Sequence, residues 1–116
     1  MTKHDLLSYL DDICIQSENI AHALQRMTYQ EFLNDAVYNS AMVRFLEIIG
    51  EAVKHVPESI RMEYPDVAWK KIAGMRDKLI HDYTEVNLPY VWYVAVELVP
   101  VLHTYVRTII RNLETQ

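Results

Sequence analysis

Apolar residues recur at three- and four-residue steps through almost the whole 116-residue chain, and this spacing predicts an all-α fold. In the first such stretch the apolar residues that recur at this spacing are Leu6, Leu7, Leu10, Ile13, Cys14, Ile20, Ala21 and Leu24. Only two glycines and four prolines interrupt the chain, which favours long helices over short strands joined by turns. A chain of this length supports one hydrophobic core. We therefore expect a single domain over residues 1–116, built as a bundle of four to five helices.

Capping residues and prolines predict where the helices begin and end. Thr28 and Glu31 form a capping-box pattern, while Asp66 and Asn87 are suitable N-caps for the helices that follow them. Pro100 falls inside the last helix and is expected to kink it. The expected helices cover residues 4–25, a stretch from 28, 35–56, a short turn within 58–64, 67–83 and 88–113.

Charge and composition narrow the class of protein. The net charge is −5, so a global basic field for gripping nucleic acid is absent and any RNA contact would have to be local. Cys14 is the single cysteine, which rules out an internal disulfide and fits a reducing compartment. We find no signal peptide, and no apolar run near the roughly 18–20 residues of a membrane span. A soluble cytoplasmic protein without a membrane partner is expected.

Standard motifs for cofactors and metals are missing from the sequence. It has no glycine-rich phosphate loop, no His-Glu-x-x-His and no Cys-x-x-Cys. His4, His22, His55 and His103 lack a second ligand at helical spacing, so each is interpreted as a surface or satisfied core histidine. Cys14 lies on the apolar stripe of the first helix and is interpreted as a small core residue. We therefore expect no cofactor and no metal.

Residues 74–83, GMRDKLIHDY, bring an arginine, a histidine and a tyrosine close together. Arg76 and Tyr83 are seven positions apart and would share a face of a continuous helix. His81 is five positions from Arg76, which places it about 140° away around an ideal helix. The two residues would converge if the helix ends near His81, or if two copies of it meet across a dimer axis. Gly74 would allow close approach of another backbone.

Arginine and histidine together can support cleavage of RNA without a metal. An imidazole can take a proton from a ribose 2′-hydroxyl or give one to a leaving 5′-oxygen. A guanidinium can hold the phosphate and stabilise the additional negative charge of the transition state. In a two-fold dimer, one cleft would contain both copies of Arg76 and His81. Spacing alone does not separate such a site from a polar helix surface, because helical proteins contain many pairs at this spacing.

The stretch Arg76, four residues, His81, one residue, Tyr83 resembles the hallmark of the HEPN superfamily. Within that superfamily the chain is most similar to the HepT-like toxins of the HepT/MntA toxin–antitoxin pairs. The family's pattern is also matched by its long-helix segment, here RFLEIIGEAVKHVPESIR at 44–61, and by VAWKKIAGMRDKLIHDY and the downstream NLPYVW. The resemblance covers nearly the whole chain.

This resemblance implies a function and a partner. HEPN proteins are helical bundles that commonly form dimers, and many are metal-independent endoribonucleases. By position, Arg76 would bind and stabilise phosphate, and His81 would be the general acid and base. In the HepT/MntA pairs a small nucleotidyltransferase antitoxin transfers AMP to the motif tyrosine, here Tyr83, and so blocks the cleft. The implied partners are a second copy of the chain, an RNA substrate and an MntA-like nucleotidyltransferase.

The chain departs from the family pattern at two positions beside the motif. Asp77 stands where a polar uncharged residue is common, and Asp82 where glycine is common. Both carboxylates would repel the phosphates of RNA. Asp77 has an alternative role, which is to orient an arginine or histidine across a dimer. Four further residues are candidates for the cleft by polarity alone: Lys78, Arg44, Glu47 and Glu51.

Two alternatives remain open. Arg44, Glu47 and Glu51 fall at i, i+3 and i+7, so they form one stripe that could simply be a solvated or salt-bridged helix face. The whole protein could likewise be a non-catalytic helical binding partner of a minimal nucleotidyltransferase. The acidic net charge favours this second function, and the complete Arg76, His81 and Tyr83 pattern favours the ribonuclease.

Overall fold

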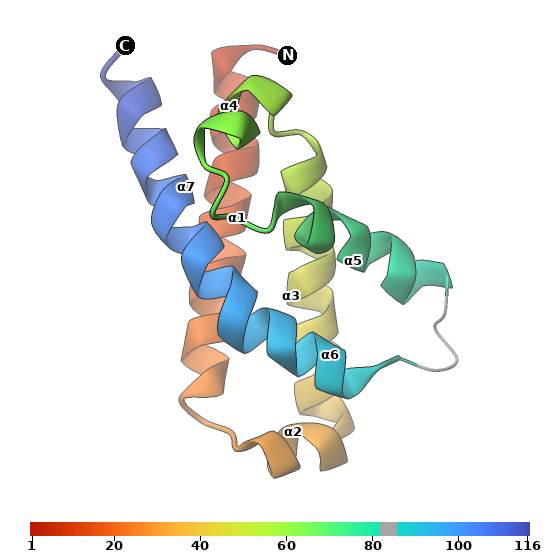
Figure 1. Cartoon of the computed structure of the whole chain (residues 1–116). Coiled ribbons are helices and arrows are strands. Elements are labelled where there is room, and N and C mark those ends of the chain that lie inside the picture. The colour runs from red at the N-terminus through yellow and green to blue at the C-terminus, as the bar shows by residue number, and fades with distance from the viewer. Residues whose placement is uncertain (82–85) are drawn as a thin grey trace.

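The computed structural model describes residues 1–81 and 86–116, without the side chains of Arg76, Leu79, Ile80 and His81. Every regular element in this part of the chain is helical, which confirms the predicted all-α fold (Figure 1). The long helices are α1 (Lys3–Leu24), α3 (Ala36–Lys54), α5 (Trp69–His81) and a last helix made of α6 (Leu88–Tyr93), the π-helical turn η1 (Val94–Leu98) and α7 (Val99–Glu114). Two short helices, α2 (Tyr29–Asn34) and α4 (Glu58–Glu63), lie in the connections.

Side-chain caps begin the helices of the first half of the chain. At the start of α2, the Glu31 backbone N–H donates to the Thr28 hydroxyl at 3.2 Å, and the Thr28 N–H donates to the Glu31 carboxylate at 3.0 Å. This reciprocal pair confirms the predicted capping box. Thr2 and Asp5 make the same arrangement at the start of α1. Asp35 caps α3 by accepting from the Val37 N–H at 2.9 Å.

The start of α5 differs from the prediction. Asp66 is not its N-cap, because residues 65–68 form a turn and the helix begins at Trp69. The Tyr64 carbonyl holds this turn by accepting from the Trp69 indole N–H at 3.0 Å and from the Val67 N–H at 3.2 Å. The Asp66 carboxylate instead accepts a hydrogen bond from the Tyr105 hydroxyl of α7 at 3.0 Å. The Asp66 side chain therefore bonds to α7, which is distant in sequence, and does not cap α5.

The last helix begins as predicted and is irregular near its middle. The Asn87 side chain caps α6 by accepting from the Tyr90 N–H at 3.1 Å. Further on, the Val99 N–H donates to the Val94 carbonyl, five residues back, which defines the π-helical turn. Pro100 follows directly and has no N–H to donate to the Val96 carbonyl. The hydrogen bonding therefore forms a wider turn directly before the proline, and the predicted kink of the helix axis stays a prediction.

The last helix is also apolar. By length and composition Leu88–Glu114 could cross a membrane, so the prediction that no stretch reaches that length is wrong. Core helices of soluble proteins pass the same test, and Val94, Leu102 and Val106 of this helix are fully buried against the rest of the chain. Packing in the core accounts for the apolar side of this helix.

The hydrophobic core lies between the long helices. α1 packs against α3 on one side and α7 on the other, and α5 packs across α3 on the side away from α7 (Figure 1). α5 contributes Trp69, Ile72 and Met75 to the core, while Asp77 and Lys78 remain exposed. The largest fully buried side chains in the described residues are Phe32, Leu10, Ile13, Ile20, Met42, Leu46, Ile49, Ile72, Met75, Leu102, Val53 and Val91. α5 is therefore fixed by one apolar face and presents the other to solvent.

Candidate active site

The motif arginine and histidine both belong to α5. Met75, which is 2% exposed, anchors the helix against the core directly before Arg76, and the helical backbone continues through His81. The side chains of these two residues lie outside the described part of the chain, as do Asp82 and Tyr83 entirely. Their convergence, and the extension of the helix to residue 83, therefore stay predictions. The structure does fix where α5 lies, and thus which described side chains surround it.

Asp77 connects α5 to α3. Its carboxylate lies 2.7 Å from the Lys54 ammonium in the last turn of α3, with side-chain exposures of 53% and 32% respectively. The pairing offsets part of the negative charge that was expected to repel RNA beside the motif. Asp77 therefore has a partner within its own chain, and no second subunit is needed to supply one.

Lys78 points to a different neighbour. Its ammonium lies 4.6 Å from the centre of the Tyr90 ring in α6, a cation–π contact. Neighbouring residues of α5 thus contact two helices, with Asp77 bound to α3 and Lys78 to α6. Both residues lie within the motif, between Arg76 and His81, and their contacts hold this part of α5 against the bundle.

The three polar residues of α3 lie together, as their spacing predicted. The Arg44 guanidinium is 3.7 Å from the Glu47 carboxylate, and Glu51 is 3.7 Å from the His55 ring nitrogen. These contacts are those expected of a salt-bridged helix face, and a role of the three residues in a cleft stays a prediction. The stripe also lines a groove of about 240 Å³ between α1 and α3, formed by Tyr9, Asp12, Arg44, Glu47, Ile48, Glu51 and Ala52.

His55 closes the end of this stripe nearest α5. Its ring stacks on Tyr9 of α1, with ring centres 4.1 Å apart and planes within 3° of parallel. His55 follows Lys54 directly, as the C-cap of α3, and Lys54 pairs with Asp77 of α5. The structure therefore groups Arg44, Glu47 and Glu51 on α3, whereas Asp77 contacts the last residue of α3 and Lys78 contacts α6.

Gly74 has open space beside it. Among the described residues, no atom lies within 4 Å of a Cβ built at this position. Close approach of a backbone within the same chain therefore does not require this glycine. Contact with the backbone of a second subunit stays a prediction.

Comparisons with known proteins decide the family. The family described as "Ribonuclease HepT-like" matches residues 13–109, a region that contains α5 and the whole Arg76–Tyr83 motif. The chain belongs to the HepT-like ribonuclease family. This confirms the family predicted from the motif.

Similar proteins come from archaea and bacteria. The chain is 41% identical over 114 residues to "Putative RNase MJ0125" of Methanocaldococcus jannaschii, covering 98% of both chains. It is 41% identical over 104 residues to "Putative RNase TTE0752" of Caldanaerobacter subterraneus, covering 90% of this chain and 93% of the relative. It is 38% identical over 94 residues to "Probable ribonuclease HepT" of Thermococcus cleftensis, covering 81% and 86%. No solved structure matches the chain.

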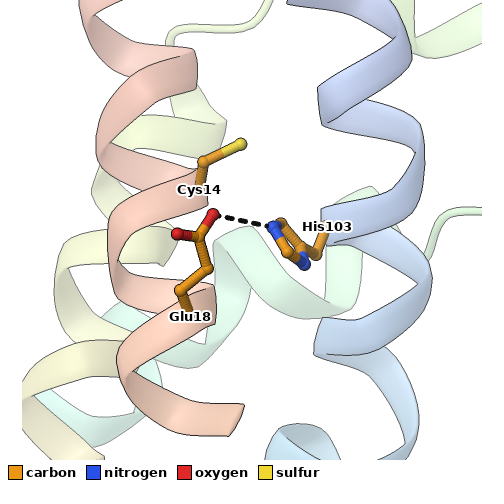
Figure 2. A group of neighbouring side chains, drawn as sticks. All are labelled: Cys14, Glu18 and His103. Carbon is orange, nitrogen blue, oxygen red and sulfur yellow. Dashed lines mark hydrogen bonds and ion pairs between the residues drawn. The ribbon is translucent and has the colours of Figure 1, made fainter. Parts of the chain in front are cut away.

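This member of the HepT-like family has a second side-chain cluster that the sequence did not reveal. Cys14 and Glu18 of α1 project toward His103 of α7, whose Nε2 lies 3.1 Å from Glu18 Oε2 (Figure 2). Cys14 was interpreted as a core residue, and it packs against the core but is only partly buried. Its i, i+4 spacing from Glu18 is visible in the sequence, whereas His103 is 85 positions beyond Glu18 and joins them only through helix packing.

The surroundings of Cys14 disfavour its thiolate form. Burial raises the pKa of the thiol to about 11, and the carboxylates of Glu18 and Asp11 act in the same direction. Arg107 on α7 opposes them. At neutral pH the side chain is therefore a thiol, and a free nucleophilic role is disfavoured.

Proposed function

We propose that this chain is an endoribonuclease that cleaves RNA by metal-independent acid–base catalysis, with Arg76 and His81 as its catalytic residues. The observation that carries the proposal is the Arg76-x4-His81-x-Tyr83 motif, which lies within the region matched by HepT-like ribonucleases. The packing of α5 supports it, because buried Trp69, Ile72 and Met75 hold the motif helix in a fixed position against the core.

The proposed chemistry requires only one base, one acid and a phosphate ligand. His81 takes the proton from a ribose 2′-hydroxyl, and the 2′-oxygen then attacks the adjacent phosphorus. The bond to the 5′-oxygen breaks, and an imidazolium gives that leaving oxygen its proton. The products are a 2′,3′-cyclic phosphate and a 5′-hydroxyl. Arg76 binds the phosphate and stabilises the additional negative charge in the transition state.

The active cleft in this proposal lies between two copies of the chain. Arg76 and His81 are about 140° apart around one ideal helix, so a second subunit provides a simple way to bring both types of side chain to one phosphate. A homodimer would supply both histidines, one as base and one as acid.

The same proposal makes the chain the toxin of a type VII-like toxin–antitoxin pair. An MntA-like nucleotidyltransferase would transfer AMP from ATP to the Tyr83 hydroxyl and release pyrophosphate. The added phosphate brings negative charge and bulk next to His81, where RNA phosphate must bind. Modification of this tyrosine would therefore inhibit cleavage without removing either catalytic residue.

Substitution of the histidine tests the catalytic part of the proposal. We expect His81→Ala to lower kcat/KM for RNA cleavage by about 10²–10⁴-fold, the usual contribution of a general acid or base. The assay contains a chelator and detects the 2′,3′-cyclic phosphate end. His22→Ala, an exposed histidine of α1, is the matched control and should keep wild-type activity. Equal cleavage by His81→Ala and wild type would refute the assignment.

Substitution of the tyrosine tests the switch. We expect Tyr83→Phe to remain active and toxic when an MntA-like nucleotidyltransferase is co-expressed, because the AMP acceptor is gone. Peptide mass spectrometry of the wild type should find AMP on Tyr83. The chain has eight tyrosines, so AMP on another one would contradict the assignment. A wild-type chain that binds the nucleotidyltransferase tightly but never cleaves RNA would instead favour the non-catalytic binding partner.

A further inference from the structure

A group of metal-binding side chain types lies between α1 and α7, on the opposite side of the bundle from α5. Cys14 and Glu18 are one turn apart on α1, and His103 on α7 projects into the same space (Figure 2). One ligand atom from each residue lies within 4.8 Å of the other two. We propose that Cys14, Glu18 and His103 form a binding site for a zinc-class divalent cation.

The distances are close to those that zinc requires. Tetrahedral zinc has bonds of about 2.0–2.3 Å, which place neighbouring ligand atoms about 3.3–3.6 Å apart. Glu18 Oε2 and His103 Nε2 are 3.1 Å apart, so a small separation of this hydrogen-bonded pair would admit the ion. The Cys14 sulfur, within 4.8 Å of both, would need a shift on the order of an ångström, which rotation about its Cα–Cβ bond can supply.

The donor atoms select the class of metal. A thiolate, an imidazole and a carboxylate offer one sulfur, one nitrogen and one oxygen, a set that suits a borderline-soft ion such as Zn²⁺. Mg²⁺ and Ca²⁺ prefer oxygen ligands throughout, so this site should reject them. Three protein ligands leave a fourth position for water. The carboxylate of Asp11, one turn before Cys14 in the same pocket, is close enough in sequence to reach it.

The site is accessible and does not carry a strong positive charge. It opens into a surface pocket of about 450 Å³, in which Cys14 and His103 are partly buried and Glu18 is exposed. Two arginines, Arg107 and Arg111, line this pocket and would repel a cation. Their charge is balanced by Asp11 and Glu18, and ionisation of Cys14 on metal binding adds a third negative group.

Metal binding would connect the two helices that carry the ends of the described chain. Two coordination bonds from α1 and one from α7 would replace the Glu18–His103 hydrogen bond between these helices. α5 packs on α3 and not at this position, so zinc binding does not depend on the proposed ribonuclease activity. A failure of one proposal therefore leaves the other unaffected.

Cobalt provides a direct test, because Co²⁺ bound to a thiolate has a distinctive ultraviolet charge-transfer band. Reduced full-length protein, stripped with a chelator, is titrated with Co²⁺. We expect one equivalent to produce the band, Zn²⁺ to abolish it, and a large excess of Mg²⁺ to leave it unchanged. Zn²⁺ should also raise the Tm, since it binds the folded chain in preference to the unfolded one. Absence of the thiolate band in the wild type would overturn the proposal.

Variants assign the ligands. Cys14→Ser, Glu18→Gln and His103→Gln should each weaken zinc binding by more than about tenfold, because even outer partners of metal ligands contribute about 10–100-fold. His22→Gln, on the exposed side of α1, is the matched control and should bind as the wild type does. Circular dichroism verifies that each variant is folded. If the folded Cys14→Ser and His103→Gln variants bind zinc as tightly as the wild type, the ion lies elsewhere and the proposal is wrong.

Discussion

The negative charge of Asp77 is partly neutralised by a lysine of another helix. In the sequence its carboxylate is an obstacle beside a site that must bind RNA phosphate. In the structure it lies 2.7 Å from the Lys54 ammonium, so the two charges partly cancel at that point of the surface. The departure from the family pattern at this residue is thus accompanied by a lysine one helix away. The pair is compatible with a motif that binds a polyanion.

Asp5 gives a prediction about pH at the scale of one residue. Hydrogen bonds from the backbone N–H and then the side chain of Thr2 lower the pKa of the Asp5 carboxyl below its usual value of 3.8. A carboxyl with a lowered pKa stabilises the folded chain above its unfolded pKa, and loses this effect as pH falls through the folded pKa. We expect Asp5→Asn to lower the Tm at pH 7, and the difference from wild type to vanish in acid.

The matched control for this cap is Asp12→Asn, an exposed position on α1 away from the capping box. Thermal unfolding followed by circular dichroism at several pH values measures both variants. A constant difference between Asp5→Asn and wild type at every pH would contradict the linkage.

The contacts of a residue could be predicted from the sequence when its hydrogen-bond partner lies only a few positions away. Thr28 and Glu31 are three positions apart and cap each other, so the sequence contained the whole interaction. Asp66 has a suitable local position for a cap, but its partner is Tyr105, 39 residues away. The contact of His103 with Glu18 was missed for the same reason, because the two residues are 85 positions apart and meet only when α7 packs against α1. Local rules recover local contacts and miss those that tertiary packing creates.

At the scale of elements, the contact between α3 and α5 sets the position of the motif. Buried Trp69, Ile72 and Met75 hold one face of α5, and the Lys54–Asp77 pair crosses to α3 on the exposed side. Both charged side chains are partly exposed, so solvent screens their attraction and limits its contribution to stability. The apolar face therefore supplies most of the free energy that docks α5, and the ion pair adds orientation.

A double-mutant cycle measures this ion pair. With Lys54→Ala, Asp77→Asn and the double variant, we expect a coupling free energy of about 0.2–1 kcal/mol, as for other exposed pairs. The coupling should fall as salt concentration rises. Urea unfolding gives the four free energies, and the cycle removes other contacts of Asp77 from the result. A parallel cycle of Asp77→Asn with Lys70→Ala, an exposed lysine of α5, should give no coupling.

Elements were predicted well where apolar spacing and caps agreed. α1 and α3 begin and end within two residues of the predicted limits, because their periodicity is long and their ends carry capping side chains. The last helix was predicted as one α-helix with a kink, whereas it contains the π-helical turn Val94–Leu98. Hydrophobic periodicity does not predict a π-helical turn, since the apolar residues stay on the inner side of the helix with or without it.

At the scale of the whole molecule, each copy of the chain contributes one Arg76 and one His81 to the proposed cleft. If the cleft combines two copies, an Arg76→Ala homodimer lacks both arginines and a His81→Ala homodimer lacks both histidines. A dimer formed from one chain of each variant contains one arginine and one histidine, and this histidine can take the 2′-hydroxyl proton and then, as an imidazolium, give it to the leaving 5′-oxygen. We expect a mixture of the two inactive variants, after subunit exchange, to recover part of the ribonuclease activity.

The control for this experiment is each variant mixed with itself under the same exchange conditions. Light scattering should give twice the 13.7 kDa mass of one chain for every sample. A monomeric mass would show that the cleft is not shared. Dimers that exchange without any recovered activity would show that one histidine per cleft is not sufficient.

The π-helical turn Val94–Leu98 has a consequence for the history of the chain. A π turn contains one residue more than an α turn in its hydrogen-bonded ring, so it can absorb an inserted residue locally. Loss of one residue here would convert the turn to regular α-helix. The sides that carry Val91 and Leu102 would still face the core. We therefore expect that one residue can be deleted within this segment while the packing of the helix on either side is kept.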